Sequence, residues 1–304
     1  MNNVISTNVK YYRNVKDYKF LPKLEQEKQK AIYDIVVKAV NKDMKLIDQQ
    51  SNSEYFNKLY ELNLITPKSK TLLSDLKNDV IISLFEDEHI KTIAGCLGFD
   101  GKIFDKAKKV ENLLKDKINL TYSDEYGYLT SNLSLIGNGM QISSVLDLSS
   151  LKEMGKIDKV IQNVRNLGFV LKYIDENLYE LSTSCTFGFT ESEVIKEFTK
   201  MLTKLDDLEN ESLNYLYPKY QDEITDKACR SFGVLSNAYL LNIDELKKHV
   251  SNILRGVNLN TLKVDRNAVL KLYSLTRTKS NFTTKDDMLA LASKVREVLK
   301  GDDK

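Results

Sequence analysis

The spacing of apolar residues changes at Thr190, and this change divides the chain into two kinds of structure. Before Thr190, short β-branched runs alternate with stretches of helical spacing, which is typical of an α+β region. After it, apolar residues recur every three or four positions, and no run of strand type returns. Thr190 and Glu193 form a capping box that begins the first of these helices. We therefore expect a mixed region followed by an all-helical one.

The mixed region predicts a sheet flanked by helices. Strands are expected at 80–85, 127–133, 140–148, 167–174 and 178–183, and helices after Pro22 and at 103–118. Only Asp175-Glu176-Asn177 separates the last two strands, which is short enough for an antiparallel hairpin. An antiparallel sheet is therefore favoured over a doubly wound parallel one.

The boundary between the two regions is expected near residue 208, which gives domains at 1–208 and 209–304. Two domains also suit a length of 304 residues. The stretch 206–211 is rich in charge and lacks apolar periodicity, as a connection between domains would. The same stretch is compatible with the exposed middle of one long helix.

The composition argues against several classes of partner. Lys and Arg number 45 against 43 Asp and Glu, so the formal net charge of +2 gives no field that would hold a nucleic acid. The three cysteines contain no CxxC pair, so neither a disulfide framework nor a metal site is expected. No apolar run reaches the roughly 18 residues of a membrane span, and no secretory signal is recognisable at the N-terminus. We expect a soluble, cytoplasmic protein with no nucleic-acid or membrane partner.

An acidic cluster follows the predicted strand at 80–85. Glu86, Asp87 and Glu88 precede His89, and carboxylates at a strand end either perform acid-base chemistry, bind a cation or form an ordinary solvated turn. If the strand continued, Glu86 and Glu88 would point to one side and Asp87 to the other. From these residues alone the solvated turn is favoured.

Six segments share their order and spacing with one enzyme family. Residues 4–14 (VISTNVKYYRN) are similar to VISSRIRLARN, 63–67 (NLITP) to HLISP, 85–91 (FEDEHIK) to NEEDHLR, 126–131 (YGYLTS) to GYLT, 137–145 (GNGMQISSV) to GTGLRASV, and 230–238 (RSFGVLSNA) to RSYGILTNA. The chain thus resembles the ATP:guanidino phosphotransferases, and most closely the bacterial protein-arginine kinases that mark proteins for Clp-type degradation.

The resemblance implies a fold, an activity and partners. The fold is the guanidino kinase catalytic fold, which is glutamine synthetase-like, followed by a helical domain that pairs subunits into a homodimer. The activity is transfer of the γ-phosphoryl group of Mg-ATP to the guanidinium of protein arginines. The implied partners are protein clients, an active arginine kinase, its zinc-finger activator and a Clp unfoldase, in a stress response.

The resemblance also assigns candidate site residues, and several depart from the family pattern. The catalytic glutamate of the family falls on Asp87, one methylene shorter, with Glu86 beside it. The family's nucleotide-binding arginines fall on Asn8, Lys10, Lys91, Gln141 and Lys172. Lysine keeps the positive charge but not the planar fork that binds phosphate in a bidentate manner, and the two amides keep neither. The family's phosphoarginine receptor, RDxxRA, falls on residues 287–292, with Asp287, Met288, Leu291 and Ala292 at its four fixed positions, so both arginines are missing.

Three hypotheses follow. The first is a catalytically weak or inactive member with a binding or regulatory role, which needs no cofactor. The second is a divergent kinase that uses Mg-ATP with Asp87, Lys10, Lys91 and Lys172. The third is a remodelled pocket for another ligand. In all three, Arg13 is expected to form a structural ion pair, and His89 is expected to be a hydrogen-bonded structural histidine.

Overall fold

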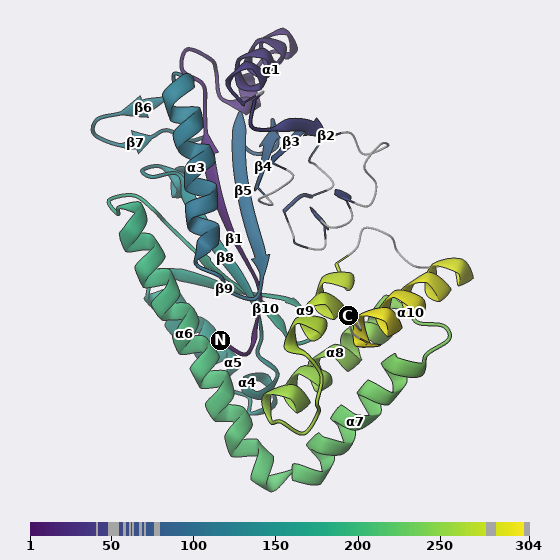
Figure 1. Cartoon of the computed structure of the whole chain (residues 1–304). Helices are drawn as coiled ribbons and strands as arrows, with labels where there is room; N and C mark the ends of the chain where they lie inside the picture. The colour runs from purple at the N-terminus through teal and green to yellow at the C-terminus, as the bar shows by residue number, and fades with distance from the viewer. Residues whose placement is uncertain are drawn as a thin grey trace.

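The computed structural model describes residues 1–40, 42–47, 55–56, 59–60, 62, 64–66, 69, 71–75, 80–277 and 284–300. Asn63 and Pro67 of the segment that resembles HLISP lie outside this set. An eight-stranded sheet with the order β2-β3-β4-β5-β1-β8-β10-β9 forms the centre, and all its neighbouring strands are antiparallel (Figure 1). Its strands are β1 (Val4–Arg13), β2 (Lys45–Ile47), β3 (Thr71–Asp75), β4 (Val80–Leu84), β5 (Ile90–Leu97), β8 (Met140–Asp147), β9 (Phe169–Asp175) and β10 (Leu178–Thr183).

Helices surround this sheet and form the C-terminal part. They are α1 (Gln26–Val40), α3 (Lys102–Lys117), α4 (Ser149–Glu153), α5 (Ile157–Asn166), α6 (Glu191–Leu216), α7 (Gln221–Asn237), α8 (Ile243–Asn258), α9 (Arg266–Leu275) and α10 (Lys285–Lys300). A short hairpin of β6 (Tyr122–Ser123) and β7 (Gly127–Tyr128) lies beside α3 (Figure 1). In the part of the chain that is described, no helix is long and apolar enough to cross a membrane.

The two faces of the sheet are covered differently. On one face, Val9 and Tyr11 pack into a core that also contains residues of α1, α3 and α6. The opposite face carries Asn8, Lys10 and Tyr12, because side chains alternate along a strand, and we call it the site face. Helices α7–α10 pack on one end of the site face, and a second apolar cluster covers β3, β4 and β5. The middle of the site face lies between these two clusters.

The fold class agrees with the prediction: an antiparallel α+β sheet followed by helices. The predicted strands at 80–85, 140–148, 167–174 and 178–183 correspond to β4, β8, β9 and β10, and the two predicted helices to α1 and α3. The strand predicted at 127–133 is wrong, since only Gly127–Tyr128 is extended and a 3-10 turn forms at Leu133–Leu135. Strand β1 was not predicted, because all its residues except Lys10 are buried and its sequence does not alternate.

Helix α6 runs without a break through the predicted boundary at residue 208. It begins with the predicted capping box of Thr190 and Glu193. The stretch 206–211 is part of this helix, so the alternative of one long helix is correct, although Asp206 and Glu209 are buried rather than exposed. The division into 1–208 and 209–304 stays a prediction.

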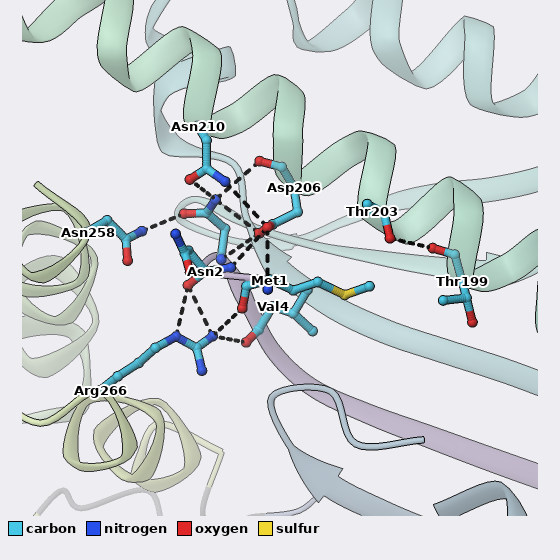
Figure 2. Close-up of polar contacts among 10 residues, drawn as sticks. Met1, Asn2, Val4, Thr199, Thr203, Asp206, Asn210, Asn258 and Arg266 are labelled. Atoms are coloured by element: carbon cyan, nitrogen blue, oxygen red, sulfur yellow. Dashed lines mark hydrogen bonds and ion pairs between the residues drawn. The ribbon is translucent and has the colours of Figure 1, made fainter. Parts of the chain in front are cut away.

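The start of β1 is held between α6 and α9. The backbone N–H groups of Asn2 and Asn3 donate to the carboxylate oxygens of Asp206 at 2.9 and 2.7 Å. From the other side, the Arg266 guanidinium donates to the carbonyl oxygens of residues 1, 2 and 4 at 2.9 to 3.1 Å, as Figure 2 shows. These hydrogen bonds connect the start of β1 to α6 and to α9.

Replacement of Asp206 should therefore destabilise the chain. In Asp206→Ala the backbone donors of Asn2 and Asn3 lose their acceptors, and Asn3 is buried, so we expect the free energy of unfolding to fall by about 2 to 4 kcal/mol. The neighbouring Asp207→Ala removes an exposed carboxylate and should change it by less than about 0.5 kcal/mol. Urea unfolding of both variants tests this, and equal effects would contradict the role of Asp206.

Candidate functional site

The register of the sheet brings four of the five predicted nucleotide-binding residues together on the site face. Lys10 of β1 lies opposite Gln141 of β8, and Asn8 lies opposite Ser143 of the same strand. On the other side of β1, Tyr12 lies opposite Lys91 of β5. The phenolic O–H of Tyr12 also donates to Gln141 Oε1 at 3.1 Å. The nucleotide-binding roles of these residues stay predictions.

Lys172 lies apart from this group. It is exposed on β9 and faces Glu180 of β10, which is opposite Val145, four residues along β8 from Gln141. With roughly 4.8 Å between strands and roughly 3.3 Å per residue along a strand, the backbones of Lys10 and Lys172 are roughly 20 Å apart. The structure therefore separates Lys172 from the other four residues.

The acidic cluster forms the turn between β4 and β5, as favoured from these residues alone, and does not continue the strand. Phe85 has a left-handed backbone with φ of 59°, so residues 86–88 do not alternate between two faces. The turn is also not solvated as a whole. Glu88 is 1% exposed, and its Oε1 accepts hydrogen bonds from the backbone N–H and hydroxyl of Ser131 at 2.7 and 2.6 Å.

Glu86, like Glu88, is held by several hydrogen bonds. It accepts hydrogen bonds from the hydroxyls of Thr66, Ser69 and Ser83, each at 2.8 Å, and pairs with Lys91 Nζ at 2.7 Å. Burial by itself would raise the pKa of Glu86, but the charge and hydrogen bond of Lys91, together with the serine hydroxyls, hold this pKa below its usual value. A carboxylate so well stabilised as an anion is a weak proton acceptor.

Asp87, at the position of the family's catalytic glutamate, is bound less firmly. Its side chain is 51% exposed and accepts one hydrogen bond, from Lys91 Nζ at 3.0 Å. Asp87 lines a cavity of about 500 Å³ together with Tyr12, Glu86 and Gln141. This cavity is the candidate active site, and it contains the two predicted catalytic residues, Glu86 and Asp87.

The two lysines of the site face are in opposite electrostatic situations. Lys91 is buried, with 4% of its side chain exposed, and is paired with two carboxylates. Lys10 forms no ion pair with any carboxylate in the described ranges. Burial lowers the pKa of Lys10, the charge of Lys91 lowers it further, and Glu180, Glu86 and Asp87 act in the opposite direction. An ATP phosphate would therefore find a free cation at Lys10 and a neutralised one at Lys91.

Two predicted structural roles are confirmed. Arg13 Nη2 pairs with Glu111 Oε2 at 2.9 Å in the fully buried core, and the guanidinium lies 3.9 Å from the centre of the Tyr128 ring. His89 Nδ1 accepts from the backbone N–H of Val15 at 3.1 Å, which leaves Nε2 to donate to the carbonyl of Lys19 at 2.8 Å. Burial lowers the pKa of His89, so it is a neutral structural histidine.

A larger cavity, of about 790 Å³, lies on the opposite side of the sheet between α3, the β6–β7 hairpin and the start of α6. Aromatic side chains line it, including the stacked pair Tyr126 and Phe187. One of the carboxylates that line it, Glu191, is held by Lys108 and Lys115. None of the predicted site residues lines this cavity. Cavity volume alone would therefore have indicated a different candidate site.

Comparison with known proteins places this geometry in one enzyme class. The family model described as ATP:guanido phosphotransferase, C-terminal catalytic domain, matches residues 4–212. The chain therefore belongs to the ATP:guanido phosphotransferase family.

Within this family the chain is similar to bacterial protein-arginine kinases. It is 27% identical to that of Caldanaerobacter subterraneus subsp. tengcongensis, over 86% of this chain and 84% of the relative, and 29% identical to that of Clostridium botulinum, over 91% and 87%. Lombricine kinase shares the fold, with a TM-score of 0.58 at 16% identity over 68% of this chain and 66% of that one. The duplicated taurocyamine kinase of Schistosoma mansoni gives a TM-score of 0.59 at 15% identity, and the match covers 68% of this chain and a third of that protein (33%).

The bonding in the turn predicts that Glu86 stabilises the fold and that Asp87 does not. Glu86→Gln leaves Lys91 with a weaker partner and three hydroxyls with a poorer acceptor, so we expect a loss of about 2 to 4 kcal/mol at neutral pH. The matched variant Asp87→Asn changes an exposed pair and should cost less than about 1 kcal/mol.

The pH dependence gives a second test of Glu86. Its pKa in the folded chain lies below the usual value, so its stabilisation is complete above the usual carboxyl pKa and is lost as the pH falls through the lowered one. The difference in unfolding free energy between wild type and Glu86→Gln should therefore narrow in acid. A difference that is constant with pH would contradict the ionised network.

Proposed function

We propose that this chain is a catalytically impaired protein-arginine kinase homologue, whose fold now has a binding or regulatory role. The observation that carries the proposal is the double ion pair of Lys91 with Glu86 and Asp87. Phosphoryl transfer to a guanidinium needs cations around the triphosphate and a carboxylate free to orient the acceptor. In this chain the cation, Lys91, is paired with the carboxylates Glu86 and Asp87, so neither the cation nor the carboxylates are free for the reaction.

The other replaced positions add to this impairment. Asn8 and Gln141 carry no charge, and Lys172 stands roughly 20 Å from Lys10 along the sheet. Loss of a single preorganised donor to a developing charge slows an enzyme by about 10²- to 10³-fold, and several such losses act on the same transition state. Their effects are not additive, but one intact lysine is a poor substitute for five arginines.

The residues at the position of the family's phosphoarginine receptor also support the proposal of an impaired homologue. Asp287, at the position of the phosphoarginine receptor, accepts hydrogen bonds from the backbone N–H and hydroxyl of Thr284 at the start of α10, at 3.3 and 2.6 Å. Asp286 beside it adds a second negative charge, which repels phosphate. We therefore propose protein partners rather than phosphorylated clients: an active arginine kinase, its activator or a Clp unfoldase, in a stress response.

A divergent active kinase is the second candidate, and Lys10 favours it. This lysine keeps the family's charge without a described carboxylate partner, on the same face as Asp87. Such an enzyme would use Mg-ATP, with Lys10 at the phosphates and Asp87 at the acceptor guanidinium. Lys91 would have to release at least one of its two carboxylates for this.

A direct assay separates the two candidates. Purified chain, Mg-ATP and an arginine-rich protein are incubated beside an active protein-arginine kinase, and phosphoarginine is measured. We expect at least about 10³-fold less product than from the active enzyme, and no further loss in Asp87→Ala. Phosphoarginine that disappears in Asp87→Ala would establish the divergent kinase and overturn the impaired enzyme.

We also propose that the chain forms a homodimer through its C-terminal helices. Tyr239 and Leu240, after α7, are 71% and 41% exposed, which is unusual for large apolar side chains. Light scattering after size exclusion should give twice the chain mass for wild type, and the chain mass for Tyr239→Glu. Tyr122→Glu, at an exposed tyrosine of β6, is the control and should remain dimeric. A wild-type monomer at micromolar concentration would contradict this proposal.

A further inference from the structure

The cavity of about 790 Å³ between α3, the β6–β7 hairpin and the start of α6 has no part in the proposed function. Tyr11 of β1 lines it, whereas its neighbour Tyr12 lines the candidate active site, so the two cavities lie on opposite faces of the sheet. Four large aromatic side chains on its wall are 46% to 57% exposed: Tyr122, Tyr126, Phe187 and Phe189. Single exposed apolar side chains are ordinary, but several around one cavity are typical of a binding surface.

The aromatic wall is held in place by backbone contacts. Tyr128 N–H donates to the carbonyl of Gly137 at 2.7 Å, and Gly137 N–H donates to the carbonyl of Tyr128 at 3.2 Å. A Cβ at Gly127 would come within 2.5 Å of the Gly137 carbonyl oxygen, so this approach requires glycine. Tyr126, in the turn of the hairpin, stacks on Phe187 of the loop before α6, with ring centres 6.2 Å apart. A surface fixed in this way loses little conformational entropy when it binds.

The charged groups of the cavity favour a cationic ligand. Its lining contains three carboxylates and one amine: Asp105, Glu125 and Glu191 against Lys108. The amine is already paired with Glu191, which also pairs with Lys115. Asp105 and Glu125, in contrast, form no ion pair with any residue in the described ranges. An anionic ligand would meet two unpaired carboxylates, whereas a cation would be attracted by them.

Aromatic rings in this region already contact cations. Lys115 Nζ lies 5.1 Å from the centre of the Tyr128 ring. The stacked rings of Tyr126 and Phe187 have no such cation among the described residues. Beside them is Glu125, whose hydrogen bond to the Tyr126 side chain raises the pKa of that tyrosine. A ring pair with a carboxylate beside it suits a guanidinium, which stacks on a ring through its plane and donates to the carboxylate.

We propose that this cavity binds a basic segment of a partner protein through an arginine side chain. The guanidinium stacks on the Tyr126–Phe187 pair and donates to Glu125, and apolar side chains of the same segment cover Tyr122 and Phe189. The cavity is much larger than one arginine side chain, which favours a segment of chain over a free guanidinium compound. The inference goes beyond the proposed function, because this cavity shares no lining residue with the candidate active site.

Fluorescence anisotropy with two labelled peptides tests the binding of arginine. One peptide has the sequence GLRLRG, and the other, GLQLQG, keeps the length and the apolar residues without the charge. Wild type should bind the arginine peptide about 10-fold more tightly or better, because the glutamine peptide lacks the stacked and paired cation. Added salt should weaken this binding. Equal affinities for the two peptides, or no binding of either at millimolar concentration, would overturn the proposal.

Substitutions in the hairpin locate the binding. Glu125→Gln and Tyr126→Ala should each weaken the arginine peptide about 5-fold or more. Asp124→Asn, at an exposed carboxylate of the same turn that does not line the cavity, is the matched control, and Tyr215→Ala, at an exposed tyrosine of α6, is the control for loss of a ring. Both controls should bind like wild type. Equal losses in Asp124→Asn and Glu125→Gln would indicate attraction by overall charge and overturn the proposal.

Two further measurements exclude other sites and occupants. Asp87→Ala should bind the arginine peptide like wild type, and a loss of affinity there would assign the peptide to the candidate active site and overturn the proposal. Light scattering should give the same mass for Tyr126→Ala and wild type. A dimer that is lost in Tyr126→Ala would assign the cavity to a second copy of the chain instead of a partner protein.

Failure of this proposal is separable from failure of the proposed function. The peptide titrations contain no ATP, so their outcome does not depend on whether the chain transfers phosphate. Phosphoarginine formation would overturn the impaired enzyme and leave the arginine-binding cavity established. Equal affinities for the two peptides would overturn the cavity and leave the impaired enzyme unaffected.

Discussion

The register of β1 is the constraint on which the rest of the structure depends. This strand lies between β5 and β8, is buried on both faces, and is gripped at its start by Asp206 of α6 and Arg266 of α9. A slip of one residue would turn Lys10 into the core and Val9 onto the site face. The positions of Lys91 and Gln141 beside Lys10 follow from the same register.

The two lysines of the site face, Lys10 and Lys91, differ in their ion pairs. Lys91 pairs with both Glu86 and Asp87, so a single positive charge faces two carboxylates and all three groups are held in ion pairs. Lys10 forms no ion pair with a described carboxylate, although the charges of Glu180, Glu86 and Asp87 act on it. The two lysines of the face therefore differ in their pairing and not in the sign of the charges around them.

Much of the fold could be predicted from local patterns, and the site only in part. The hairpin of β9 and β10 and the start of α6 follow from turn length and from the capping box at Thr190, which are local. The structural roles of Arg13 and His89 were also predicted correctly. The turn at 85–89 was favoured from its residues, but its burial was not, because the groups that hold Glu88 come from Ser131, far along the chain. The buried state of Glu86 depends on Thr66 and Ser69, which are far from it in sequence.

By itself, the sequence determined the family, the α+β region followed by helices, and which of the family's arginines are replaced, because motifs and periodicities are properties of neighbouring residues. Tertiary structure alone decided which replacements share a site. It paired Lys91 with two carboxylates, left Lys10 unpaired among the described residues and moved Lys172 away. The physical reason is that strand pairing and hydrogen bonding act through space over a few ångströms, while the residues that they bring together, such as Lys10 and Gln141, are far apart along the chain.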